Sequence, residues 1–168
     1  AIYPALVPVD RVERGGPDKP WHLLINADNF HALQLLLYAY EGQVDVIYID
    51  PPYNTGARDW KYNNDYVDAS DSFRHSKWLS MMKKRLQTAK RLLSQDGILI
   101  TAIDDNEFST LRLLLGELMP HYTHETVVVN HHPQGSGGDN VSATHEYAIV
   151  SVPKGKHLFL GDEVENET

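Results

Sequence analysis

Apolar residues recur along this chain at two alternating spacings, which predict strands and helices in turn. A short apolar run at residues 22–26 predicts a strand, and a helical spacing over residues 29–41 predicts a helix that ends at Gly42. The expected buried face of this helix consists of Phe30, Leu33, Leu36, Leu37 and Tyr40. Residues 46–49 are apolar without interruption, which is typical of a strand buried on both faces of a parallel sheet.

The next segment repeats the alternation. Residues 78–93 predict a long amphipathic helix, an Asp96-Gly97 turn follows it, and residues 98–103 predict a further strand. Asp104, Asp105 and Glu107 resemble a helix start, and Pro120 stops that helix. Its expected buried stripe is formed by Phe108, Leu111, Leu114, Leu115 and Leu118.

The last two apolar runs, at about residues 125–130 and 145–152, predict an antiparallel pair at one side of the sheet. The glycine cluster at 135–138 lies between them and is interpreted as their connecting loop. Strands that alternate with helices predict an α/β protein, here a three-layer sandwich with mostly parallel strands. In such a sheet the carboxyl end of the strand at 46–49 lies at an edge that binds ligands.

Three stretches carry no such spacing. Residues 1–21 are rich in proline and glycine and are interpreted as an arm or linker, residues 22–153 as the folded region, and residues 154–168 as an acidic tail or the start of a further segment. Residues 54–75 predict a long polar loop that is poorly ordered or displaced without its ligand.

The composition and net charge exclude several kinds of site and binding function. The 168 residues suit one domain, and the absence of cysteine excludes disulfides and thiolate metal sites. No apolar stretch is long enough to span a membrane, so a soluble protein is expected. A cytoplasmic location is expected, with which the absence of cysteine is compatible. The nine histidines show no helical metal-ligand spacing, and no metal site is expected. A net charge of −8 argues against a self-sufficient binder of nucleic acid.

The strongest chemical signal follows the strand at 46–49. Two prolines force Asp50, Pro51, Pro52 and Tyr53 out of the sheet as a stiff extended elbow. A carboxylate and a proline carbonyl can each accept one hydrogen from a planar exocyclic amine, while a tyrosine stacks on the attached ring. The alternative is a Pro-Pro turn that only closes the strand, with Asp50 as an incidental cap.

At this elbow the chain resembles a known family. Residues 50–56, Asp-Pro-Pro-Tyr-Asn-Thr-Gly, resemble the catalytic motif of S-adenosylmethionine-dependent DNA adenine-N6 methyltransferases. The longer stretch is similar to the β-group enzymes and to the modification subunits of type III restriction-modification systems. Residues 23–37, 78–118 and 142–152 resemble further blocks of the family, with Ala27 where glycine is usual. The resemblance implies a Rossmann-like methyltransferase fold.

One departure from the family is informative. β-group enzymes carry a glycine-rich methionine-binding loop, F-x-G-x-G, after the catalytic motif and the target-recognition region. This sequence contains no such loop. We therefore interpret the chain as an incomplete methyltransferase, the half that holds the catalytic motif.

The resemblance also implies roles for individual residues. Asp28, Asn29, Asp50 and Pro51 are expected to contact the cofactor, S-adenosylmethionine, although Asp28 suits a helix N-cap equally well. The expected catalytic residues are Asp50, Pro51, Pro52 and Tyr53. The expected substrate-binding residues are Tyr53, Asn54 and Thr55, with turn-forming roles equally open for the last two.

The expected substrate is duplex DNA with a flipped adenine, and the expected partners are a restriction subunit or a second modification subunit. Two alternatives stay open. Cytosine N4 or a glutamine amide also presents an amine, but those families more often begin the motif with Ser or Asn. A domain without the glycine-rich loop could instead bind DNA or a partner chain without methyl transfer.

Overall fold

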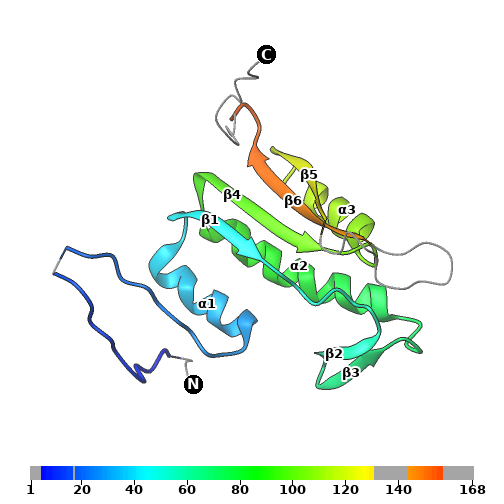
Figure 1. The fold of residues 1–168 in the computed structure, drawn as a ribbon, viewed down its shortest axis with the longest axis horizontal. Helices are drawn as coiled ribbons and strands as arrows, with labels where there is room; N and C mark the ends of the chain where they lie inside the picture. The colour runs from blue at the N-terminus through cyan, green and yellow to red at the C-terminus, as the bar shows by residue number, and fades with distance from the viewer. Residues whose placement is uncertain (1–4, 17, 131–143, 157–168) are drawn as a thin grey trace, which may run out of the picture.

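The computed structural model describes residues 5–16, 18–130 and 144–156 (Figure 1). Three helices and six strands form there. In chain order they are α1 (Asn29–Tyr40), β1 (Val44–Ile49), β2 (Ala57–Tyr62), β3 (Asp65–Asp68), α2 (Arg74–Leu92), β4 (Leu93–Ile103), α3 (Phe108–Leu118), β5 (Tyr122–Asn130) and β6 (His145–Pro153). The described parts of the arm and of the tail contain no helix or strand. The glycine cluster at 135–138 lies outside the described residues.

Four strands form the main sheet, in the order β1-β4-β6-β5. β1 runs parallel to β4, and β6 runs antiparallel to both β4 and β5. It follows that β1, β4 and β5 share one direction and only β6 is reversed. The predicted antiparallel pair at one side of the sheet is therefore confirmed, and the described sheet is mixed, with one parallel and two antiparallel pairings.

Helices α2 and α3 cover one face of this sheet (Figure 1). Trp78, Met82 and Leu86 of α2 pack with Leu99 and Ile103 of β4 in one core cluster. Leu111, Leu114 and Leu115 of α3 complete it, as the periodicity predicted. α1 packs beside α2, where Gln34 Nε2 donates a hydrogen bond of 3.0 Å to Thr88 Oγ1.

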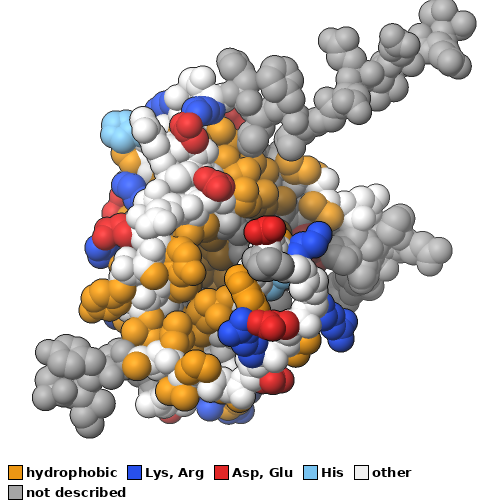
Figure 2. All heavy atoms as spheres, turned by 90° about the vertical axis from the view of Figure 1, so that its left-hand side faces the viewer, with side chains coloured by type: hydrophobic (Ala, Val, Ile, Leu, Met, Phe, Trp, Pro, Cys, Tyr) orange, Lys and Arg blue, Asp and Glu red, His pale blue; other side chains and the backbone are white. Residues whose placement is uncertain are grey.

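The opposite face of the sheet is open in the described part of the chain. Val46 and Tyr48 of β1 are 55% and 63% exposed, and Val127 and Val129 of β5 are exposed as well. The expectation that residues 46–49 are buried on both faces is wrong here, because no described element packs against that side. The described residues thus form two of the three predicted layers. Hydrophobic side chains gather on the side of the molecule that carries the arm, α1 and β1 (Figure 2).

Two further expectations were wrong near the start of the sheet. Residues 22–26 form no strand, and β1 is the outermost strand of the described sheet. Helix α1 forms as predicted, but it buries no residue fully, and Tyr40 is 46% exposed.

The predicted Asp96-Gly97 turn is also absent, because β4 begins at Leu93 and runs through it. The pairing of β1 with β4 shifts register between Val44 and Val46. A side chain at Gly97 would bring its Cβ within 2.8 Å of the Val44 carbonyl oxygen. Glycine therefore allows the close approach of the two strands at this irregularity.

The predicted loop at 54–75 is largely a hairpin of β2 and β3. Trp60 and Val67 are buried in the core and Tyr62 packs against it, so the expectation of poor order is wrong. Asn63 and Asn64 have φ of 50° and 70°, the left-handed conformation that a two-residue hairpin turn requires. Because Trp60 packs in the core, residues 54–75 do not form a loop whose aromatic side chains all face DNA.

Candidate active site

The elbow lies where the sequence predicted it, at the carboxyl end of β1. β1 ends at Ile49, and Asp50 follows with its side chain exposed beyond the sheet. β4 ends at Ile103 along the same edge, because the two strands are parallel neighbours. Its continuation, Asp104 and Asp105, therefore reaches this edge too.

Two carboxylates act on the Tyr53 hydroxyl. It donates a hydrogen bond to Glu146 Oε2 at 3.1 Å, and the Asp50 carboxylate lies close enough to affect its ionisation. Burial, and after it the neighbouring carboxylates of Asp50 and Glu146, raise the pKa of Tyr53 well above its ordinary value of 10.0. The phenol therefore keeps its proton and acts as a donor.

Glu146 is a site residue whose role the sequence analysis did not identify. It stands at the start of β6, which runs antiparallel to β4, so the start of β6 and the end of β4 share an edge. This topological signal was available, since the sequence predicted the last strand to be antiparallel. A His-Glu-Tyr start to that strand places its carboxylate beside the elbow.

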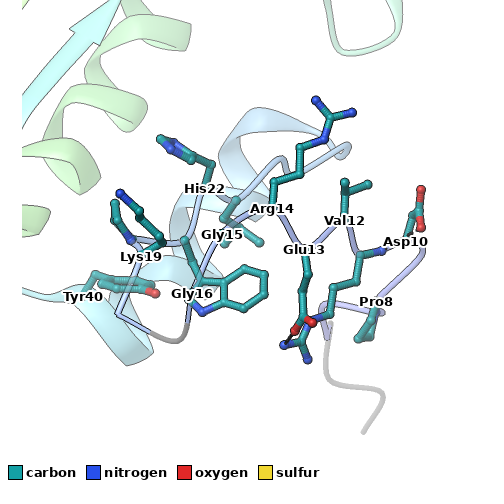
Figure 3. Close-up of a pocket in the computed structure, with 14 residues that line it drawn as sticks. Pro8, Asp10, Val12, Glu13, Arg14, Gly15, Gly16, Lys19, His22 and Tyr40 are labelled. Carbon is teal, nitrogen blue, oxygen red and sulfur yellow. Dashed lines mark hydrogen bonds and ion pairs between the residues drawn. The ribbon is translucent and has the colours of Figure 1, made fainter.

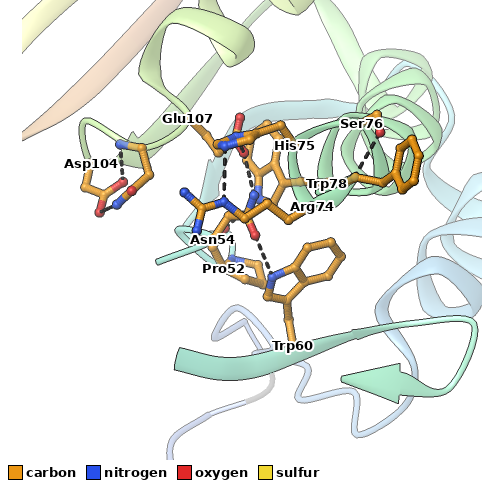
Figure 4. Close-up of polar contacts among 11 residues, drawn as sticks. Pro52, Asn54, Trp60, Arg74, His75, Ser76, Trp78, Asp104 and Glu107 are labelled. Carbon is orange, nitrogen blue, oxygen red and sulfur yellow. Dashed lines mark hydrogen bonds and ion pairs between the residues drawn. The ribbon is translucent and has the colours of Figure 1, made fainter. Parts of the chain in front are cut away.

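Hydrogen bonds to core side chains also fix the elbow (Figure 4). The Pro52 carbonyl accepts a hydrogen bond of 2.6 Å from Trp78 Nε1 of α2. Asn54 is fully buried, has φ of 60°, and bonds to Trp60 and Glu107. Its side chain is enclosed, which supports the turn-forming role rather than contact with a substrate.

The remaining predicted residues lie in turns and caps. Thr55 is exposed, and its Oγ1 accepts a weak bond from the Ala57 amide at 3.4 Å. Asp28 is the N-cap of α1 and accepts a bond of 3.2 Å from the His31 amide. Asn29 is the first residue of α1. Asp28 therefore acts as the N-cap of α1 in this structure.

The edge around the elbow is acidic. Burial, opposed by bonds from Asn106, raises the pKa of Asp104, and the charges of Asp105 and Glu146 add to it. Asp105 accepts a bond of 2.7 Å from the Tyr147 hydroxyl. A concentration of carboxylates suits a cationic ligand group such as a sulfonium, because its positive charge relieves their mutual repulsion. The donor set here therefore fits S-adenosylmethionine.

A separate hollow of about 1050 Å³ lies between the arm and α1 (Figure 3). It is lined by Tyr40 and by residues 8, 10–16 and 19–23, and by none of the elbow residues. Arg11 lies over the Trp21 ring, 4.5 Å from its centroid. Since this hollow holds none of the amine-binding groups, the candidate active site is the elbow.

Metal-binding clusters and membrane spans are both absent from the part of the chain that the structure describes. No group of three or more His, Asp or Glu side chains there could hold a metal ion. Among the helices of those residues, none is long and apolar enough to cross a membrane.

Solved structures share this fold. TTHA0409 of Thermus thermophilus, assigned as a DNA modification methylase, matches 82% of this chain with 56% of its own, at 15% identity and a TM-score of 0.55. The complex of M1.HpyAVI with SAM matches 84% of this chain with 60% of its own, at 18% identity and a TM-score of 0.53. This likeness confirms the predicted Rossmann-like methyltransferase fold.

Curated relatives are closer in sequence. The type III restriction-modification EcoP15I Mod subunit of Escherichia coli is 34% identical over 161 residues, and the type II methyltransferase M.KpnI of Klebsiella pneumoniae is 35% identical over 126. The match covers 82% of this chain and 25% of the EcoP15I subunit, so the chain spans about a quarter of that relative. The family described as DNA methylase matches residues 44–168, more than half of the sequence. This chain therefore belongs to the DNA methylase family.

Proposed function

We propose that the elbow methylates the N6 amine of adenine in DNA, as part of a restriction-modification system. The observation that carries this proposal is the exposed Asp50 beside Tyr53, whose hydroxyl is hydrogen-bonded to Glu146, at the carboxyl end of β1. A planar amine attached to an aromatic ring matches that set of groups. S-adenosylmethionine, when bound, supplies the methyl group.

The Asp50 carboxylate and the Pro51 carbonyl each accept a hydrogen bond from one N–H of the amine. This draws the nitrogen towards tetrahedral geometry and frees its lone pair, which is otherwise delocalised into the ring. Positioning and electrostatics therefore supply most of the rate. Asp50 need not be a strong base, because the nitrogen becomes acidic once it carries the methyl group and an ordinary carboxylate or water can take the proton.

Tyr53 stacks on the flipped adenine, which must leave the duplex to reach the elbow. Such stacking is worth about 1–3 kcal/mol. Pro52 keeps the elbow stiff, and its carbonyl is tied to Trp78. Thr55, exposed beside the elbow, is proposed to contact the surroundings of the target base.

Asp28 and Asn29 are proposed to contact the cofactor together with Asp50 and Pro51. Their position at the start of α1, with Asp28 exposed, supports this role. The proposed partners are a restriction subunit or a second copy of the modification subunit. The names of the Mod relatives, which are subunits of restriction-modification enzymes, support the first of these. Because the proposed substrate is DNA, the proposed location of the protein is the cytoplasm.

The direct test is nucleoside analysis. The full-length protein that carries this sequence is incubated with duplex DNA and S-adenosylmethionine, and the DNA is digested and analysed by mass spectrometry. N6-methyladenine is expected. N4-methylcytosine would replace the adenine assignment with the cytosine alternative, and no methylated base at all would support the non-catalytic alternative.

A further inference from the structure

A buried carboxylate is hydrogen-bonded to Asn54, the residue that follows the elbow. Glu107, at the entry to α3, is fully buried, and its Oε1 accepts a hydrogen bond of 2.5 Å from Asn54 Nδ2 (Figure 4). Its Oε2 has no hydrogen-bond partner among the residues that the structure describes. Burying a carboxylate is costly unless polar groups compensate it, so its orientation calls for a cause.

Capping of helix α3 does not explain the orientation of the Glu107 side chain. Glu107 occupies the N-cap position of α3, yet its side chain makes no capping bond to the amides of the first turn. It turns instead towards the elbow and towards α2, where His75 Nδ1 lies 2.6 Å from the same oxygen. Arg74 Nε donates to His75 Nε2, so the imidazole proton lies on Nδ1 and is donated to Glu107.

Asn54 connects Glu107 to the neighbouring Tyr53. Asn54 has a left-handed φ of 60°, which an asparagine adopts at a modest cost, and its Oδ1 accepts a bond of 3.1 Å from Trp60 Nε1. On the other side of Tyr53, the Pro52 carbonyl is bound by Trp78. The residue before Tyr53 and the residue after it are therefore both tied to the core.

We propose that Glu107 is a positioning residue, which holds Asn54 and thereby sets the place of the Tyr53 ring and of Asp50. This inference deepens the proposed function and rests on it, because the geometry matters only if the elbow grips a base. Without the carboxylate, the Asn54 amide loses its acceptor in a buried place and the turn rearranges. A displacement of about 1 Å costs catalysis on the order of a hundredfold.

The test compares Glu107→Leu, Glu107→Gln and Asn54→Gly in the full-length protein. Leucine removes the acceptor, glutamine keeps a carbonyl oxygen for Asn54, and glycine removes the Asn54 side chain while adopting the same φ freely. Glu117→Leu is the matched control, since Glu117 is an exposed carboxylate on the same helix that pairs with Lys83.

The readouts are kcat and KM for DNA methylation, affinity for the duplex, and fluorescence of 2-aminopurine at the target position. We expect kcat to fall about tenfold to a hundredfold for Glu107→Leu and Asn54→Gly, with duplex affinity changed less than about threefold. Extruded-base fluorescence should fall with kcat. Glu107→Gln should recover most of the activity, Glu117→Leu should match the wild type, and the double variant Glu107→Leu/Asn54→Gly should lose no more than either single variant.

Unchanged kcat in folded Glu107→Leu, or losses that multiply in the double variant, would overturn the positioning role. If Glu107→Leu does not fold, Asn54→Gly decides, and a normal kcat there overturns the inference. Absence of methylation by the wild type in the same assay refutes the proposed function itself, so the two failures are distinguishable.

Discussion

The Tyr53 hydroxyl donates a hydrogen bond of 3.1 Å to Glu146, a residue 93 positions further along the chain. The elbow is thus linked to β6 as well as to β1. Because β6 pairs with β4, the end of the main sheet fixes the ring that is proposed to hold the base. A local turn of the Asp-Pro-Pro type needs no such distant partner.

Replacement of Tyr53 by alanine should weaken capture of the flipped base by about 1–3 kcal/mol, because the stacking ring is lost. Tyr53→Phe keeps the ring and loses only the bonds of the hydroxyl, worth about 1 kcal/mol. Methylation kinetics with the full-length protein measure both. Equal losses in the two variants would show that the hydroxyl, not the ring face, is what matters.

Replacement of Asp50 by alanine should lower turnover far more than it lowers binding of DNA or cofactor. The contact between its carboxylate and the amine is strongest as the nitrogen becomes tetrahedral, so its loss affects mainly the transition state. The measurement is the single-turnover methylation rate beside equilibrium binding of the duplex. Near-wild-type turnover would leave the elbow as a structural turn only.

Alanine at Gly97 should destabilise the fold by about 1–3 kcal/mol, because the new Cβ would meet the Val44 carbonyl oxygen at 2.8 Å. Gly116→Ala is the matched control. Gly116 lies in α3 with nothing near its missing Cβ, so alanine there should stabilise by about 0.5–1 kcal/mol. Thermal denaturation of the two variants should shift in opposite directions.

Acid should destabilise the fold through His124. Burial, and after it the charge of Arg112, lowers the pKa of His124 below its ordinary value of 6.5, while its Nδ1 lies 2.8 Å from Ser151 Oγ. The unfolded chain then takes up the proton first. The contribution of the neutral imidazole is therefore complete above pH 6.5 and is lost as the pH falls below it.

His124→Asn should remove this part of the pH dependence. Denaturation of wild type and variant at pH 7 and pH 5 gives the comparison, because the other histidines are common to both proteins. The wild type should lose more stability than the variant on acidification. Identical losses would mean that His124 is not neutral and buried as described.

Calorimetric titration of these 168 residues with S-adenosylmethionine should show weak or undetectable binding, since they contain no F-x-G-x-G loop to grip the methionine end. The full-length protein that carries the sequence is the comparison. Low-micromolar affinity for the 168 residues would contradict the interpretation that they hold only the catalytic-motif half.

Much of the fold could be predicted because its signals are local. The helices around Trp78 and Leu111 and the final strand pair each show their periodicity within one segment. The hairpin of β2 and β3 was missed because Asn63-Asn64 is a weaker turn signal than Asn-Gly. A strand at 22–26 was predicted from its residues, but a strand also needs a neighbour to pair with.

The candidate site divides in the same way. Its reactive part is contiguous, and Asp50 and Tyr53 could be identified from one short motif. Its supports, Glu107 and Glu146, come from turns and strand ends far along the chain. Sequence spacing alone cannot say which carboxylate turns inward, because that depends on how the ends of β1, β4 and β6 meet.

The open face and free edge of β1 have a consequence for handling these residues by themselves. The outer edge of β1 presents backbone amides and carbonyls that pair with no described strand, next to the exposed side chains of Val46 and Tyr48. The one charged side chain of β1, Asp45, already accepts a hydrogen bond of 3.2 Å from Ser94. Such an edge is a template for further strands. Association of folded copies through this edge, rather than unfolding, should then set the concentration at which a preparation of this segment aggregates.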